Sequence, residues 1–89
     1  MTSAEFQKKA TMLVANYVMD HLDKSDDITF SIDNVYVIWM CKTLQNNKAL
    51  FGTTLHDGRC FEVTYNGDKK EFYIDVYKKF ENKCYKEEW

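Results

Sequence analysis

Cysteine and histidine are the residues of this sequence that could form a metal site or a reactive nucleophile. The three cysteines are Cys41, Cys60 and Cys84, and the two histidines are His21 and His56. Zinc sites usually contain at least one closely spaced pair of ligands, and this sequence has no such pair. An odd number of cysteines without close pairs also indicates reduced thiols, as in a cytosol. We therefore expect three buried structural cysteines and no bound metal or cofactor.

A nucleophile activated by a neighbouring base is the second chemistry that these residue types allow. Cys60 follows His56 by four residues, but spacing alone does not bring a thiol to an imidazole, and His56 with Asp57 fits a turn. Glu62 and Glu71 could form a carboxylate pair, although solvated cross-strand residues explain them better. The sequence has no glycine-rich phosphate loop, no G-x-S-x-G and no H-E-x-x-H motif. We expect no catalytic residue and no enzymatic activity.

Length and charge limit the kinds of protein that this chain can be. Its 89 residues suffice for a single domain, spanning residues 1–89, and a hydrophobic content of 45% is too high for a disordered chain. The net charge is −2 and Arg59 is the only arginine, which argues against a protein that binds duplex DNA. No apolar run approaches the roughly 20 residues of a membrane span, and no secretory signal is recognisable. We expect no association with membranes.

The elements that must position these residues begin with an amphipathic helix. Thr2 and Glu5 have the spacing of a capping box, in which each side chain bonds to the backbone of the other. Apolar residues follow at helical spacing without glycine or proline, so the sequence predicts a helix over residues 3–22. Residues 23–34 are polar and fit either a short strand or one helical turn. Their apolar anchors are Ile28, Phe30 and Ile32.

Runs of β-branched and aromatic residues predict an antiparallel sheet of three to four strands in hairpin order. These runs are residues 35–44, 49–55, 60–65 and 70–74. We expect two-residue turns at 46–47 and 57–58, and a four-residue loop before the last strand. The apolar spacing becomes helical from Asp75, which predicts a C-terminal helix to about Lys86. The predicted fold class is therefore α+β, with both helices on one side of the sheet in a two-layer domain.

The expected turns decide which side chains share a face of the sheet. One face should form the core and includes Val37, Trp39, Cys41, Leu50, Gly52, Thr54, Phe61, Val63, Tyr65, Phe72 and Ile74. The opposite face carries a candidate protein-contact surface made of Tyr36, Ile38, Met40, Phe51, Leu55 and Tyr73. Contiguous apolar patches on monomers usually have a binding role. Three alternatives remain open for this surface: residues 23–34 cover it, a second copy of the chain binds it, or a foreign protein does.

Nucleic-acid binding through the same face is the alternative function. Aromatic residues could stack on the bases of single-stranded or structured nucleic acid while basic residues contact phosphates. The residues concerned are Tyr36, Phe51, Tyr73, Lys42, Lys48 and Arg59. The expected element order also resembles that of double-stranded RNA-binding domains, but the start of the expected last helix lacks their basic cluster. Protein binding is therefore the leading hypothesis.

Several stretches distributed over most of the length of the chain have a family signature. They are TSAEF at 2–6, WMCKTLQNNKAL at 39–50, TTL at 53–55 with the Asp57 and Gly58 pair, EVTYNGD at 62–68 and YIDVYKK at 73–79. The chain resembles a family of small uncharacterised proteins encoded by phages and prophages of Gram-positive bacteria. The resemblance implies a phage origin and the cytoplasm of a bacterial host, and it assigns no catalytic residue. We expect a small phage accessory protein that binds a host factor or itself, with a homodimer as one form.

Overall fold

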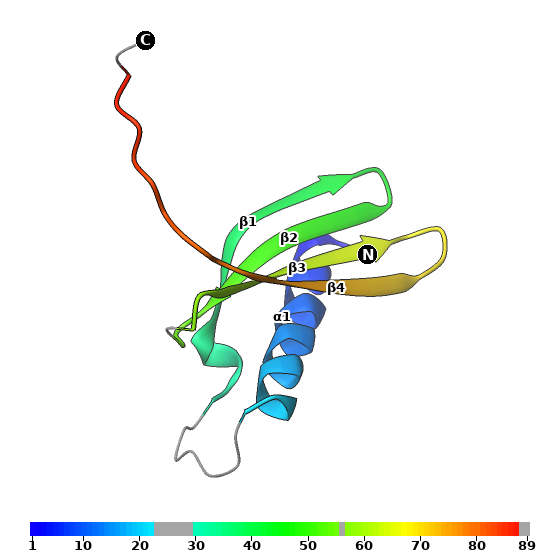
Figure 1. The fold of residues 1–89 in the computed structure, drawn as a ribbon. Helices are drawn as coiled ribbons and strands as arrows, with labels where there is room; N and C mark the ends of the chain where they lie inside the picture. The colour runs from blue at the N-terminus through cyan, green and yellow to red at the C-terminus, as the bar shows by residue number, and fades with distance from the viewer. Residues whose placement is uncertain (23–29, 56, 88–89) are drawn as a thin grey trace.

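The computed structural model of the protein describes residues 1–22, 30–55 and 57–87. It contains one helix that packs across one face of an open antiparallel sheet with the strand order β1-β2-β3-β4 (Figure 1). The elements are α1 (Ser3–Asp20), the 3-10 turn η1 (Ile32–Asn34), β1 (Val35–Thr43), β2 (Asn46–Thr53), β3 (Arg59–Asn66) and β4 (Glu71–Lys78). The predicted α+β class, the N-terminal helix and the hairpin order of the strands are confirmed.

The start of α1 is fixed by the predicted capping box. Glu5 N donates a hydrogen bond of 3.1 Å to Thr2 Oγ1, and Thr2 N donates one of 3.2 Å to Glu5 Oε1. The bond from the Thr2 backbone, with a second from its hydroxyl, holds the pKa of Glu5 below its ordinary value. The helix ends at Asp20, slightly earlier than residue 22. No helix within the described ranges is both long and apolar enough to cross a membrane.

The core lies between α1 and one face of the sheet. The buried residues of α1 recur at helical spacing and are Phe6, Ala10, Val14, Ala15 and Val18. They form one cluster with buried residues of the two central strands, which are Ala49, Phe51, Phe61, Val63 and Tyr65. Phe6 stacks on Phe72 of β4 with ring centroids 6.3 Å apart, so the helix also reaches the edge of the sheet.

The described part of the 23–34 segment lies on the helix side of the sheet. Phe30 belongs to the core cluster, and Ile32 lines a depression beside α1 with Ala4 and Met12. Residues 32–34 form the 3-10 turn η1, so this part is a helical turn and not a strand. Ile28 lies outside the described residues. The described anchors of this segment therefore do not cover the opposite face of the sheet.

The pairing of β2 with β3 differs from the expected register, and this difference reverses the faces to which the side chains of β2 point. A two-residue turn predicts Thr54 opposite Phe61, whereas Phe51 lies opposite Phe61 in the structure. Because successive side chains of a strand point to opposite faces, this odd-numbered shift moves Phe51 onto the helix side. Phe51 is fully buried there. Leu50 and Gly52 lie on the face away from α1, so their predicted place in the core is wrong.

A bulge in β1 changes the faces of this strand as well. Ile38 is an extra residue between the pairs Val37–Phe51 and Trp39–Leu50. An extra residue in one strand shifts the alternation of all residues after it. Val37 stays on the helix side, whereas Trp39 lies on the opposite face and is 42% exposed. The prediction that Trp39 is buried in the core is therefore wrong.

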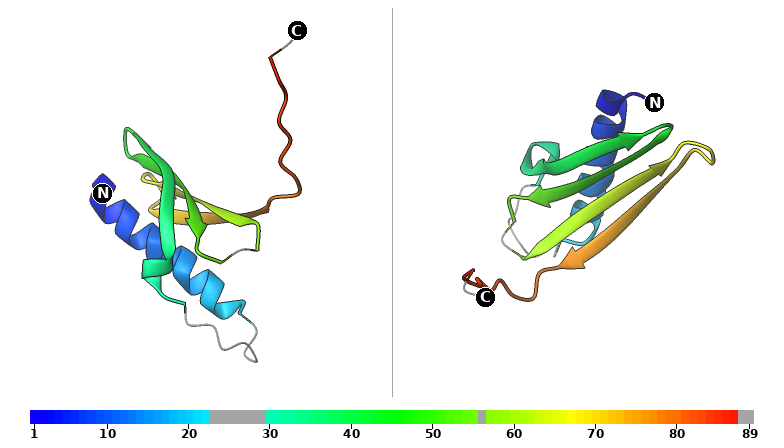
Figure 2. Two further views of the ribbon diagram at one scale, coloured as in Figure 1. Left: turned by 90° about the vertical axis from the view of Figure 1, so that its left-hand side faces the viewer. Right: turned by 90° about the horizontal axis from the view of Figure 1, so that it is seen from above.

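The predicted C-terminal helix is not formed by residues 75–87. β4 continues to Lys78, with Val76 opposite Phe61 and Tyr77 opposite Cys60. Residues 79–87, which we call the C-terminal tail, have no regular secondary structure and extend away from the sheet (Figures 1 and 2). Strand pairing with β3 thus outweighs a helical spacing that rests on only a few apolar residues.

Asn47 is a polar residue buried within the helix-side core. Its side chain is 2% exposed, and neither Oδ1 nor Nδ2 has a hydrogen-bond partner among the described residues. An unpaired buried polar group costs about 1–3 kcal/mol. We expect Asn47→Leu to raise the free energy of unfolding by about 1 kcal/mol in urea denaturation. A lower free energy of unfolding in the variant would contradict the burial of an unpaired amide at this position.

Candidate functional site

The sheet face opposite α1, which we call the open face, is not covered by any described segment (Figure 2). It consists of alternate residues from all four strands. Its exposed large hydrophobic and aromatic side chains are Tyr36, Ile38, Trp39, Tyr73 and Tyr77, each between 42% and 53% exposed. Three of them come from β1 and two from β4, so they border the face on both edges.

The structure brings together only part of the predicted contact surface. Of the residues predicted for this surface, three lie on the open face: Tyr36, Ile38 and Tyr73. Phe51 is fully buried under α1, and Met40 packs against the core on the same side. Leu55 follows β2 and is half-buried against the core. The expectation that Met40 and Phe51 belong to an exposed patch is wrong, because the bulge and the β2–β3 register move both to the helix side. Leu55 lines one depression together with Tyr36 and Ile38.

Trp39 and Tyr77 belong to the open face although the sequence did not place them there. The bulge at Ile38 has no clear sequence signal, so Trp39 could not be assigned to this face from its spacing. Tyr77 follows directly once β4 is extended beyond residue 74, and the run of aromatic and β-branched residues before it favours that extension.

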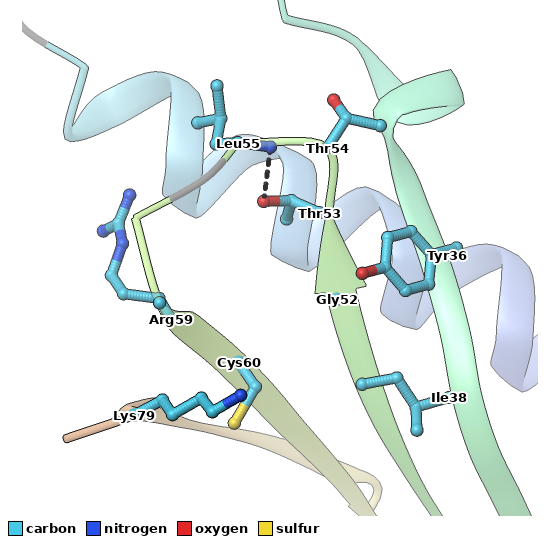
Figure 3. A pocket seen from close by; sticks show the side chains of 10 residues that line it. Tyr36, Ile38, Gly52, Thr53, Thr54, Leu55, Arg59, Cys60 and Lys79 are labelled. Atoms are coloured by element: carbon cyan, nitrogen blue, oxygen red, sulfur yellow. Dashed lines mark hydrogen bonds between the residues drawn. The ribbon is translucent and has the colours of Figure 1, made fainter. Parts of the chain in front are cut away.

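An open depression with a volume of about 820 Å³ lies where the open face meets the β2–β3 connection (Figure 3). Its walls include Tyr36, Ile38, Leu55, Arg59, Cys60 and Lys79. The ring of Tyr36 lies directly over Gly52, because an ideal Cβ at Gly52 would be only 2.6 Å from Tyr36 Cζ. A glycine at this position therefore lets the tyrosine ring approach the backbone of β2.

The charged groups of the open face are mainly carboxylates. Glu62 lies opposite Asp75, and Glu71 lies opposite Asn66, so the register does not pair the two glutamates with each other. Lys48 Nζ lies 3.4 Å from Glu62 Oε1. Lys48 is therefore already ion-paired with a carboxylate of the open face.

Two phenols lie beside these carboxylates. The negative charge of Glu62, followed by burial and the charge of Asp75, raises the pKa of Tyr77. The hydrogen bond that the Tyr73 hydroxyl donates to the Glu71 carboxylate raises the pKa of Tyr73. Because both pKa values lie above that of a free phenol, both hydroxyls are neutral at physiological pH. The face therefore combines aromatic surface, neutral hydroxyls and negative charge.

The basic residues that were expected to contact phosphates do not gather on the open face. Lys48 lies there but is ion-paired, as described above. Lys42 lies opposite Asn47 on the helix side, and its ammonium donates a hydrogen bond to the carbonyl of Leu44. Arg59 Nε donates a hydrogen bond of 2.7 Å to Asp57 Oδ2. The alternative surface for nucleic acid also loses Phe51, which is buried.

The cysteines and histidines do not form a reactive cluster in the described part of the chain. All three cysteines are free, but Cys41 and Cys84 are exposed and Cys60 is half-buried, so the expectation of three buried thiols is wrong. The ring of His21 stacks on Tyr17 with centroids 4.0 Å apart, and its Nδ1 lies 2.8 Å from Tyr17 O. His56 lies outside the described residues. Within residues 1–22, 30–55 and 57–87, no three metal-ligating side chains lie together.

Comparison with known proteins finds one family for this chain. A family described as "Family of unknown function (DUF6275)" matches residues 7–87. No curated protein and no solved structure matches the chain. The matched range contains most of α1, all four strands and the whole C-terminal tail.

Proposed function

The chain belongs to the DUF6275 family, whose function is unknown, and we propose that it is a non-catalytic domain that binds a protein partner through its open face. The observation that carries the proposal is the group of half-exposed side chains on a sheet face without a covering layer. Tyr36, Ile38 and Trp39 lie together on β1, and contiguous apolar patches on monomers usually have a binding role. Tyrosine and tryptophan are also the residue types enriched at protein interfaces, where a ring supplies area and a hydroxyl supplies a hydrogen bond.

The chemistry of the open face supports a role without catalysis. Among the described residues, the depression is lined by the thiol of Cys60 but by no histidine or carboxylate that could act as its base. Two of the three carboxylates of the face, Glu62 and Glu71, are engaged by Lys48 and Tyr73, as in a polar interface.

The resemblance to phage and prophage proteins supports the biological setting of the proposal. A small accessory protein made in the cytoplasm of a bacterial host would act by occupying the surface of a host factor or by self-association. Both modes need an exposed contact surface, and neither needs a catalytic group. The open face provides such a surface.

Single-stranded nucleic acid is the second candidate ligand, because the exposed rings of the open face could stack on bases. The charges of the open face argue against nucleic-acid binding. Three carboxylates lie on this face, and Lys48, the lysine of its strands, is already ion-paired. Binding to phosphates requires uncompensated positive charge and weakens steeply with salt. A labelled single-stranded oligonucleotide should therefore give no change in fluorescence anisotropy at low salt. Salt-sensitive binding in this assay would favour the second candidate over the first.

The proposal predicts that Ile38→Lys abolishes protein binding without unfolding the domain. Ile38 is 51% exposed on the open face, and Met12 is 46% exposed on α1, so Met12→Lys is a matched control. Both variants should stay within about 0.5 kcal/mol of the wild-type free energy of unfolding. If the partner is a second copy bound through the open face, sedimentation should show that Ile38→Lys loses this self-association and that Met12→Lys keeps it. If the partner is a host protein, its capture from a nuclease-treated lysate should likewise be lost in Ile38→Lys and kept in Met12→Lys.

Two outcomes would contradict the proposal. In the first, Ile38→Lys unfolds the domain under dilute conditions in which the wild type is a folded monomer, so that the patch is internal core. In the second, Ile38→Lys and Met12→Lys behave alike in every binding assay, so that the open face has no special role.

A further inference from the structure

We propose that the free edge of β4 pairs with the β4 edge of a second copy of the chain, so that two four-stranded sheets join into one continuous antiparallel sheet. This inference goes beyond the proposed function, because its interface is the backbone edge of β4 and leaves the open face uncovered. It is carried by the unpaired backbone groups of β4, by the unbroken register of this strand and by its self-complementary sequence.

β4 is an outer strand of the sheet, and one side of its backbone has no partner among the described residues. Lys79 N donates a hydrogen bond of 2.6 Å to Gly58 O, which shows that residue 79 bonds toward β3. Because bonded positions alternate along an antiparallel pair, the odd-numbered residues of β4 bond to β3. Figure 2 shows no described segment beside the other side of the strand. The N–H and C=O groups on that side belong to Phe72, Ile74, Val76 and Lys78.

The two outer strands differ in how well they could accept another strand. The ladder of β1 is interrupted by the bulge at Ile38, and bulges are a common protection of edge strands against pairing. β4 forms eight consecutive pairs with β3 without a bulge, and the sequence contains no proline that would block its edge. A regular edge of this length is a template for another strand. β4 is therefore the edge at which the sheet can be extended.

Symmetry restricts the register in which two β4 strands can pair. The two-fold axis of such an antiparallel pair is perpendicular to the sheet, so residues that point to the free edge lie opposite each other. The two registers that pair most of the strand are centred on Ile74 and on Asp75. A centre at Asp75 would place Lys78 opposite Phe72 and two carboxylates opposite each other, which is destabilising. The register centred on Ile74 has neither contact.

Apolar side chains match each other on the helix side in the register centred on Ile74. The two copies of Ile74 lie opposite each other, and Phe72 of each copy lies opposite Val76 of the other. Val76 is 37% exposed and is not among the residues packed against the core, so the contact with Phe72 removes exposed apolar surface from water. The pairing ends at Glu71, because Lys70 has a positive φ of 54° and belongs to the turn.

Phenols and carboxylates match each other on the open face in the same register. Tyr73 of each copy lies opposite Asp75 of the other, and Tyr77 lies opposite Glu71. A phenol can donate a hydrogen bond to a carboxylate, and no carboxylate lies directly opposite another one. Because the axis is perpendicular to the sheet, both open faces point to the same side. The dimer would therefore extend the candidate contact surface across two copies instead of covering it.

Amide hydrogen exchange of the full-length protein tests the pairing, because the two sides of β4 give separate signals. At concentrations at which sedimentation shows dimers, the amides of Phe72, Ile74 and Val76 should exchange at least about tenfold more slowly than in the dilute monomer. The amides of Tyr73 and Asp75 bond to β3 in both states and should change less. A wild type that stays monomeric, or outward amides that exchange equally fast in dimer and monomer, would overturn the inference.

Val76→Lys tests the same contact by sedimentation equilibrium. The symmetry introduces the lysine twice into the interface, beside each Phe72, and the dimer dissociation constant should rise at least about tenfold. Ile32→Lys is the matched control, because Ile32 is 51% exposed on the helix side and precedes β1 at the other edge of the sheet. This control should leave the dissociation constant unchanged. Equal effects of the two variants would contradict pairing at β4.

Ile38→Lys separates this inference from the proposed function. It changes the open face on β1 and should leave the edge dimer intact. If Ile38→Lys dissociates the dimer and Val76→Lys does not, edge pairing is wrong and the open face is the interface. If Val76→Lys dissociates the dimer while Ile38→Lys binds every partner as the wild type does, edge pairing is supported and the proposed function fails. If Val76→Lys unfolds the chain, the exchange of the wild-type amides decides.

Discussion

Replacing Phe51 by alanine is expected to lower the free energy of unfolding by about 3–5 kcal/mol. Phe51 is fully buried at the centre of the sheet, opposite Phe61 on one side and Val37 on the other. Removing its ring leaves a cavity between β2 and α1 that neighbouring side chains fill only in part. A domain of this size has a free energy of unfolding of roughly 4–13 kcal/mol, so the substitution would remove a large part of its stability. Urea denaturation followed by circular dichroism measures it.

Leu50 and Trp39 provide the controls for this prediction. Both lie opposite each other on the open face and contact solvent. Leu50→Ala and Trp39→Ala should each cost about 1 kcal/mol or less, as for a cross-strand pair at a surface. A greater loss for Leu50→Ala than for Phe51→Ala would mean that the faces of β2 are reversed, and the open face would then have to be redefined.

Gly67→Ala is expected to lower the free energy of unfolding by about 1–3 kcal/mol, because it forces two hairpin turns apart. An ideal Cβ on Gly67 would collide with the carbonyl oxygen of Gln45, which is a backbone atom of the β1–β2 turn. A backbone atom cannot rotate away as the end of a side chain can. Two hydrogen bonds hold the turns at this distance: Gln45 Nε2 donates to Asp68 Oδ1 at 2.6 Å, and Gly67 N donates to Asn46 Oδ1 at 2.9 Å.

Asp68→Ala separates the steric effect at Gly67 from the loss of a hydrogen bond. This variant removes only the exposed bond to Gln45, so it should cost no more than about 0.5–1.5 kcal/mol. Thermal denaturation of both variants under the same conditions gives the comparison. If Gly67→Ala is as stable as the wild type, the two turns do not pack against each other in the way described here.

Local signals in the sequence were sufficient for several elements of the fold. The capping box at Thr2 and Glu5 places the start of α1, because the same two hydrogen bonds form in the structure. The loop between β3 and β4 has the predicted four residues, since Asn66 pairs with Glu71. The observed register places Val76, and not Ile74, opposite Phe61. Because this shift is an even number of residues, every side chain of β4 stays on its predicted face.

The remaining errors arise where non-local pairing outweighs local signals. The Asn46 and Asn47 pair favours a turn, yet the turn lies at Leu44, which adopts a positive φ of 56°, and both asparagines belong to β2. The Asp57 and Gly58 pair favours a tight hairpin, yet β2 and β3 pair with Phe51 opposite Phe61. No local pattern marks these choices, because they depend on how β2 fits under α1.

These register errors also explain why the candidate site was only partly predicted. Tyr36, Ile38 and Tyr73 reach the open face because β4 and the start of β1 have the expected alternation. The odd-numbered shift between β2 and β3 places Leu50 on the open face instead of Phe51, and the bulge in β1 places Trp39 there as well. The sequence indicated a second apolar face correctly, but which residues lie on that face depends on whether the register shifts by an odd or an even number of residues.

A dilution series followed by the backbone amide signals of the full-length protein tests the role of the open face most directly. We expect concentration-dependent shifts at Tyr36, Trp39 and Tyr77 of the open face. Amides on the exposed side of α1 should not change over the same range. Shifts confined to α1, or no shifts in a protein that stays monomeric and binds no partner, would contradict the assignment of the open face as a contact surface.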